Sequence, residues 1–152
     1  MSVDGIIPNL TASAAVSPYR FVKVSGNMTG AHCATQTDIA VGVSDGSITA
    51  FNGTYNADVG DPIQLQQGNF MQVQVAGNTD AGELLTATTD GKALAENGAD
   101  PGAQYHMIAA QDAPGADSII WAFWRPTFSG QVVTDGSTIT GNGTDDAPIA
   151  LV

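Results

Sequence analysis

The stretch FMQVQVAG, residues 70–77, decides the fold class of this chain. Met71, Val73 and Val75 alternate with two glutamines, and Gly77 ends the run. Because successive side chains of a strand point to opposite faces, a period of two is the pattern of a strand with one buried face. We therefore predict a strand here, with its apolar side chains in the core and its glutamines facing outward.

Short runs of the same kind cover much of the chain. Apolar or alternating runs occupy residues 19–25, 39–44, 47–51, 62–67, 84–89, 105–111 and 118–124. Turn-forming dipeptides lie at Asp45-Gly46, Gly68-Asn69, Asp90-Gly91 and Asp135-Gly136. The best helical candidate, residues 81–88, is assigned to a strand or turn, because no long window free of Gly and Pro has helical spacing. We expect an all-β fold, a small antiparallel β-barrel or sandwich of about eight to ten short strands.

Composition divides the chain into three segments. Residues 1–14 lack alternation and contain a proline, which predicts an extended N-terminal arm. Residues 15–126 are the predicted β-barrel domain. Residues 127–152 are predicted to form a linker and a short C-terminal β-hairpin appendage. Independent folding is rare below about 40 residues, so this appendage is expected to dock on its own domain or on another chain.

The charge balance excludes several classes of partner. Charged residues make up only 12% of the chain, and four basic residues against fifteen acids leave a net charge of −11. The basic residues are Arg20, Lys23, Lys92 and Arg125. A phosphate backbone and an anionic membrane would both be repelled, since no basic cluster reverses the charge locally. We therefore expect no nucleic-acid partner and no membrane partner.

Targeting signals and cysteine usage point to the compartment in which the chain is made. The start MSVDGIIPNL has no basic n-region and no long apolar run, so we predict no signal peptide. No run approaches the roughly 18 apolar residues of a transmembrane helix. Cys33 is the only cysteine, which leaves no intrachain disulfide. The expected site of synthesis and residence is the cytoplasm.

Residue types that carry chemistry are scarce. His32 and Cys33 are neighbours, but neighbours on a strand point to opposite faces, so a Cys nucleophile would need His106 instead. The alternative is a buried Cys beside a surface His, which we favour. Metal-ligand spacings and nucleotide-binding motifs are missing, and the acidic stretch 142–146 lacks the spacing of a calcium loop. We predict no catalytic residues, no metal and no cofactor, and hence no enzyme.

The run SIIWAFW, residues 118–124, carries the largest aromatic residues. Trp121 and Phe123 fall on one strand face and Trp124 on the other. Such rings could line a sugar cleft, but a core on one face and a subunit interface on the other is the interpretation that we favour, because aromatic residues beside an Arg are typical of interfaces. The predicted intersubunit residues are Trp121, Phe123, Trp124, Arg125, Ile139 and Ile149.

Over residues 15–126 the order of these runs resembles the small capsid decoration, or cement, proteins of tailed bacteriophages. The matching elements are a strand with Gly42-Val43, a turn with Gly60-Asp61, the strand from Val73 to Gly77 and a hairpin from Gly82 to Ala93. The resemblance implies a β-barrel that forms a trimer on the outer face of a capsid. It also makes the major capsid protein the expected partner.

The C-terminal stretch VVTDGSTITGNGTDDAPIAL, residues 132–151, is similar to a short element of phage fibre and other virion structural proteins. The similar positions run from Val133 to Ile149. Many decoration proteins lack such a tail, so its role is left open at this point. Two virion-type resemblances in one chain favour a virion protein.

The resulting hypothesis is a non-enzymatic virion protein on the capsid exterior, made in the cytoplasm of a bacterial host. As a homotrimer it would cement neighbouring major capsid proteins and stabilise the capsid. The resemblance to decoration proteins leads us to predict capsid contacts along the N-terminal arm, at Ile6, Ile7, Pro8 and Leu10. The alternative is a head-fibre, tail-fibre or receptor-binding component that recognises a host glycan.

Overall fold

The computed structural model describes residues 9–46, 55–96 and 102–128. These residues form nine strands and one short 3-10 helix, η1. The elements of the N-terminal half are β1 (Thr11–Ala12), β2 (Phe21–Gly26), β3 (Thr29–His32) and β4 (Gly42–Val43). The later elements are β5 (Phe70–Gln74), β6 (Leu84–Ala87), η1 (Thr89–Gly91), β7 (Ala93–Ala95), β8 (Gln104–Ala109) and β9 (Ile119–Phe128). The all-β prediction is therefore confirmed.

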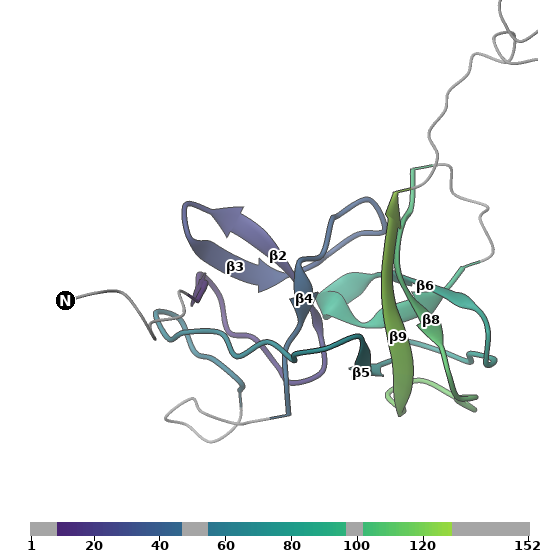
Figure 1. The fold of residues 1–152 in the computed structure, drawn as a ribbon. Helices are drawn as coiled ribbons and strands as arrows, with labels where there is room; N and C mark the ends of the chain where they lie inside the picture. Colours follow the sequence, from purple (N-terminus) through teal and green to yellow (C-terminus); the bar gives the residue numbers. More distant parts are fainter. Residues whose placement is uncertain (1–8, 47–54, 97–101, 129–152) are drawn as a thin grey trace, which may run out of the picture.

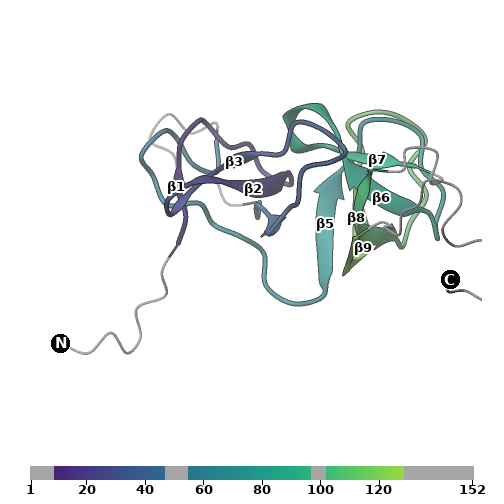
Figure 2. The same cartoon turned by 90° about the horizontal axis from the view of Figure 1, so that it is seen from above.

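The strands form two sheets that lie beside each other (Figures 1 and 2). The small sheet has the order β1-β3-β2-β4, and the large sheet has the order β5-β9-β8-β6-β7. Within the two sheets only β1 and β3 pair in parallel, and every other strand pair is antiparallel. Strands far apart in sequence meet in the large sheet, since β5 pairs with β9 in register from Phe70 opposite Phe123 to Gln74 opposite Ile119.

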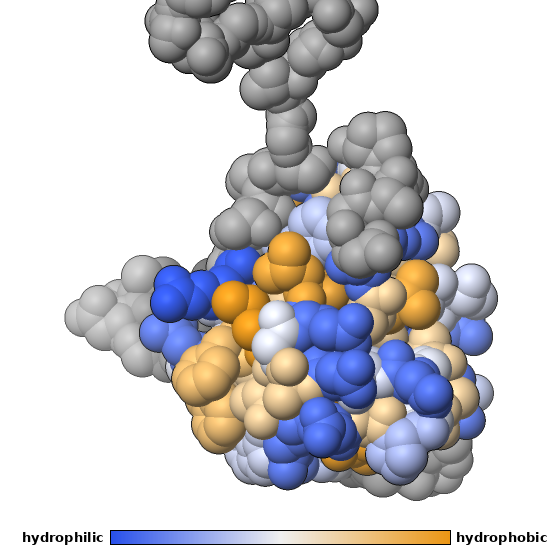
Figure 3. All heavy atoms as spheres, turned by 90° about the vertical axis from the view of Figure 1, so that its right-hand side faces the viewer, coloured by the Kyte–Doolittle hydropathy of each residue, from blue (hydrophilic) through white to orange (hydrophobic). Residues whose placement is uncertain are grey.

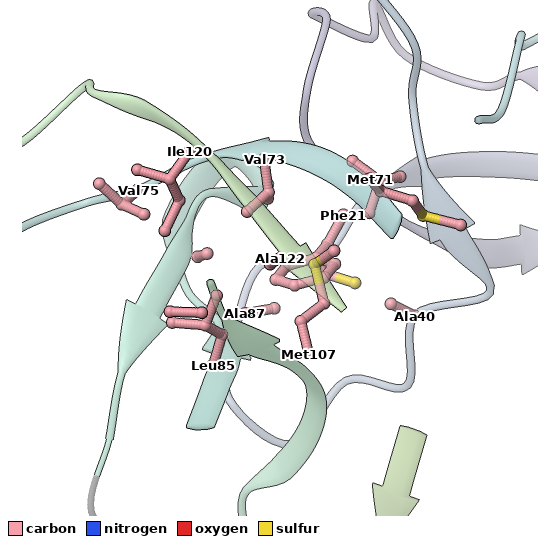
Figure 4. Packing of buried hydrophobic residues seen from close by; sticks show 14 of the residues in the cluster. Phe21, Ala40, Met71, Val73, Val75, Leu85, Ala87, Met107, Ile120 and Ala122 are labelled. Atoms are coloured by element: carbon pink, nitrogen blue, oxygen red, sulfur yellow. The ribbon is translucent and has the colours of Figure 1, made fainter. Parts of the chain in front are cut away.

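The main core lies between the sheets and is built largely from the inner face of the large sheet (Figure 4). Met71 and Val73 of β5 are buried, as the alternation of that stretch predicts. Phe21 of β2 is fully buried in the same cluster, so the small sheet also contributes to the main core. A second, smaller cluster lies within the small sheet and contains Val16, Val22 and Ile63.

A hairpin tip and an arginine join the two sheets. Asp90 and Gly91 link β6 to β7 with φ values of 61° and 72°, the positive φ at both central residues that a type I′ turn requires. An added Cβ on Gly91 would lie 2.7 Å from the carbonyl oxygen of Phe21, so glycine permits the close approach of this tip to β2. Next to it, Arg20 donates to the Gln74 side chain and to the Asp90 carbonyl, each at 2.9 Å.

Several elements differ from the sequence-based expectation. Residues 62–67 form isolated bridges, from Pro62 to Thr11 and from Leu65 to Ser44, rather than a strand. β3 was not anticipated, and the second strand of the predicted Gly82–Ala93 hairpin is β7. β1 lies inside the range assigned to the arm, and β9 runs to Phe128, past the expected domain end at residue 126. The predicted run 47–51 and the C-terminal hairpin around Asp135-Gly136 lie outside the described residues.

Candidate interaction surface

The outer face of the large sheet carries a row of apolar side chains. Cross-strand pairing places Phe70 of β5 opposite Phe123 of β9, Phe123 opposite Ile108 of β8, and Ile108 opposite Leu84 of β6. Directly opposed residues share one face of a sheet, so these four form a continuous apolar row across four strands. Figure 3 looks at this side of the molecule and shows hydrophobic residues gathered beside hydrophilic ones.

Three aromatic rings form the centre of this surface, which we call the aromatic face: Phe70, Trp121 and Phe123. The rings of Phe70 and Trp121 are stacked at 4.8 Å with an interplanar angle of 14°, and Phe70 and Phe123 are also 4.8 Å apart. The residues remain 47%, 38% and 47% exposed in that order. Clusters of exposed apolar side chains of this kind mark interaction sites on soluble proteins.

Alternation along β9 explains the position of these rings. Ile120 and Ala122 point inward and are buried, whereas Trp121 and Phe123 point outward. The backbone around them is held in place, because Trp121 donates its N–H to the Gln111 side chain at 2.8 Å and its carbonyl accepts from Ala110 at 2.9 Å. The rings are therefore presented by a regular strand in the middle of the sheet rather than by a loop.

Stacking limits how much ring face is open to a sugar. Sugars stack on an open ring face, whereas Phe70 and Trp121 cover one face of each other. Edges and half-covered rings suit the interdigitated packing of a protein–protein interface, in which aromatic residues are enriched.

The predicted interface residues fall into three groups. Trp121 and Phe123 lie on the aromatic face, and Arg125 is exposed beside it, on a hollow of about 310 Å³ that Asn69 and Phe123 also line. Trp124, also predicted at the interface, takes the opposite face from these rings and packs against the core near Phe21 and His106. The remaining two, Ile139 and Ile149, lie outside the described residues. Sequence reasoning did not anticipate Leu84 and Ile108, whose place on this face follows only from the β6–β8–β9 register.

The predicted capsid-binding residues are placed only in part. Ile6, Ile7 and Pro8 lie outside the described residues. Leu10 is half-buried and packs against the small-sheet cluster, and its carbonyl accepts a hydrogen bond from Ile63 at 2.9 Å. Capsid binding by this set stays a prediction.

Most of the basic side chains are engaged inside the fold. Lys23 pairs with Asp38 at 3.0 Å, Lys92 pairs with Asp117 at 2.6 Å, and Arg20 joins the two sheets. Burial disfavours the charged form of Asp38, but hydrogen bonds from the Ala34 amide, Lys23 and the Thr35 amide together lower its pKa. Three of the four basic side chains thus form ion pairs or hydrogen bonds within the fold.

The single cysteine of the chain, the candidate nucleophile, lies in the core. Cys33 is fully buried, and burial raises the pKa of its thiol to about 12, so the thiol stays protonated at neutral pH. Burial lowers the pKa of His32 to about 4, and its Nε2 accepts a hydrogen bond from the Ser17 amide at 2.9 Å. Cys33 is buried as expected, whereas His32, which was expected at the surface, is half-buried.

His106 is also a core residue. Its ring is 1% exposed, stacks on Trp124 at 5.9 Å and lies 5.1 Å from the ring of Phe21. A register shift between Tyr105 and Met107 accompanies this placement, as β-bulges commonly re-aim a side chain. Burial lowers the pKa of His106, although the carbonyl of Asp38 near its Nε2 opposes the shift. In the part of the chain that the structure describes, no His, Cys, Asp and Glu side chains gather in a group that fits a metal.

Comparison with known proteins yields a likeness of fold. No protein-family model matches the sequence, and no curated protein matches it. Among solved structures, the chain is similar to "head fiber gp8.5 N base in bacteriophage phi29", with a TM-score of 0.60 and 20% identity. The match covers 81% of this chain and 96% of that chain. The likeness shows that the two share the arrangement of their strands. Within the described ranges, no helix is long and apolar enough to cross a membrane.

Proposed function

We propose that this protein is a structural component of a bacteriophage virion. The observation that carries the proposal is the fold it shares with the base of a phage head fibre over 81% of its length. The resemblance of its strand order to capsid decoration proteins, and of residues 132–151 to a fibre element, supports the same class of protein.

In the finer form of this proposal the protein sits on the capsid exterior and joins neighbouring copies of the major capsid protein. A charge of −11 suits a position away from packaged DNA. Symmetric, repeated contacts allow modest individual affinities to hold such a protein firmly. It needs no cofactor and carries out no reaction, in keeping with the buried state of Cys33.

The proposed homotrimer forms through the aromatic face. An apolar surface without charged side chains is where copies of an acidic chain approach with least repulsion, and Phe70, Trp121 and Phe123 supply the ring area typical of interface centres. Arg125 at the rim adds a positive group that complements the acidic surface of a neighbouring copy.

A head-fibre component is the second candidate, because the similar structure is the base of such a fibre. In that case the described domain anchors the protein on the head and the C-terminal residues lead away from it. The glycan-binding role earlier attached to this alternative gains no support from the stacked rings.

Light scattering after size exclusion tests the trimer, and co-sedimentation with capsids lacking the protein tests capsid binding. We expect the wild type to run as a trimer and to bind such capsids. The double variant Trp121→Ser/Phe123→Ser should run as a monomer and bind far more weakly. Val59→Ser is the matched control, since Val59 is an exposed apolar residue (66%) outside both sheets.

Two outcomes would contradict the proposal in different ways. A wild-type monomer removes the trimer but leaves a virion role open. Absence of binding to capsids, together with signals on a glycan array, removes the decoration role and favours receptor recognition.

A further inference from the structure

Residues 62–67 present one backbone edge that faces away from β4. The Asp45 amide donates to the Gln64 carbonyl at 2.9 Å, and the Gln66 amide donates to the Val43 carbonyl at 2.8 Å. Because alternate residues of an extended chain direct their N–H and C=O to opposite sides, the amide and carbonyl of Leu65 face the other side. Within the described residues, the Leu65 amide has no hydrogen-bond partner.

An antiparallel pairing with the N-terminal residues already begins on that side. Thr11 bridges to Pro62, the Ala12 amide donates to the Asp61 carbonyl at 2.8 Å, and the Ile63 amide donates to the Leu10 carbonyl at 2.9 Å. This pairing sets Leu10 opposite Ile63. Continued in the same register, it places Pro8 opposite Leu65 and Ile6 opposite Gln67.

A groove of about 490 Å³ lies where this continuation would run. Its lining includes Leu10 and Leu65 together with three exposed apolar side chains, Val24, Met28 and Val41. These three are 52%, 52% and 45% exposed. A groove of this size and apolar lining beside an open backbone edge has the features of a site that accepts an added strand.

Side-chain parity decides which residues of an added strand would enter the groove. Directly opposed residues point to the same face, and Leu10, Ile63 and Leu65 all line the groove. In this continuation Pro8 and Ile6 would share that face, whereas Ile7 would point away from it. Proline lacks an N–H, so Pro8 would accept from the Leu65 amide without donating in return, which is tolerated where a strand begins or at an edge.

We propose that the chain's own N-terminal segment fills this groove, with Ile6 and Pro8 packed on Leu65, Val41 and Met28. The segment joins the fold at Asn9, which itself lines the groove. The tether gives an effective concentration of roughly millimolar, so the same chain outcompetes a second copy at ordinary protein concentrations. The proposal goes beyond the virion role and does not depend on it.

If Ile6 and Pro8 lie in the groove, fewer apolar side chains of the N-terminal segment are accessible to a capsid. Two of the apolar residues predicted to touch the capsid are then turned into the groove. Ile7 is left on the outer face as the residue available for a partner.

Amide hydrogen exchange by NMR at Leu65 tests the proposal on the full-length protein. We expect Ile6→Asp to speed exchange at Leu65 roughly tenfold or more, because a carboxylate would not stay in an apolar groove. Ile7→Asp is the matched control, with the same chemical change on the opposite face, and should leave the Leu65 rate unchanged. Deletion of residues 1–8 should match or exceed the effect of Ile6→Asp, while amides of β8 keep their protection in all variants.

Equal effects of Ile6→Asp and Ile7→Asp would overturn the register. An unprotected Leu65 amide in the wild type would overturn the docking itself. Protection that rises with protein concentration would show that a second copy, rather than the same chain, fills the groove. None of these readouts involves capsids, so failure here is separate from failure of the proposed function.

Discussion

The two faces of the large sheet use hydrophobic residues in opposite ways. On β9 the inner face presents Ala122, which is fully buried, while the outer face presents Trp121 and Phe123, which are 38% and 47% exposed. The inner face is covered because the small sheet approaches it closely, as the tip at Gly91 shows. Trp121 and Phe123 lie outside, where another molecule can cover them, whereas Trp124 of the same strand packs against the core. The two faces differ in whether the small sheet covers them, because large rings occur on both.

The largest expected difference is between two Phe→Ala variants, one of a ring packed against the inner face and one of a ring on the outer face. Phe21→Ala empties a fully buried position and is expected to lower the free energy of unfolding by about 3–5 kcal/mol. Phe123→Ala removes a ring that is 47% exposed and should change the stability of the monomer by less than about 1 kcal/mol. Urea denaturation at several protein concentrations measures both.

Concentration dependence separates the two roles. If copies associate through the aromatic face, the midpoint of the wild type rises with protein concentration. In Phe123→Ala the midpoint should no longer depend on protein concentration. In Phe21→Ala the midpoint should be lower at every concentration but should still rise with concentration. A loss of several kcal/mol from Phe123→Ala at every concentration would mean that the outer ring belongs to the core of the monomer.

Strands with clear alternation were predictable from the sequence. The stretch 70–77 gave β5, residues 84–89 gave β6, and residues 118–124 gave most of β9 with its faces correctly assigned. The Asp90-Gly91 dipeptide marked the β6–β7 turn because positive φ at two successive positions needs such residues. These features depend on local pattern and local sterics, which a single sequence contains.

Features that depend on distant pairing were not predictable. β3, with the sequence TGAH, has little β propensity and forms a strand because β1 and β2 pair with it on either side. Leu84 and Ile108 join the aromatic row only through the register of β6, β8 and β9. The burial of His106 accompanies a register shift between Tyr105 and Met107, which the alternation of residues 105–111 does not predict.

The contact between the sheets can be weakened without touching a side chain of the core. Gly91→Ala adds a Cβ 2.7 Å from the Phe21 carbonyl oxygen at a φ of 72°. The left-handed backbone costs about 1–2 kcal/mol for an L residue, and the clash with β2 adds to it. Gly68→Ala is the control, because Gly68 also has a positive φ (92°) but nothing within 4 Å of an added Cβ.

Thermal unfolding of the two glycine variants gives the cost of the close approach as the difference between them. We expect Gly91→Ala to be the more destabilised. Equal losses would show that backbone strain alone accounts for both, and that β2 and the hairpin tip are free to separate.

The last expected effect is that of pH on His32 and His106, the two histidines of the chain. The pKa of His32 is lowered to about 4 by burial, and burial also lowers the pKa of His106, so the unfolded chain binds protons below pH 6.5 before the folded chain does. Stability is therefore fully present above about pH 6.5 and falls as the pH drops, by at most about 1.4 kcal/mol per pH unit for each histidine.

Urea denaturation between pH 7.5 and pH 5 measures this slope and stays above the range in which the carboxylates titrate. His106→Gln removes one titrating group and should reduce the slope by up to half, whatever it does to the stability at pH 7.5. The same slope in His106→Gln as in the wild type would mean that the folded protein accepts a proton at His106 as readily as the unfolded chain does. The inner side of β8, beside Phe21 and Trp124, would then tolerate a charge although the small sheet covers it.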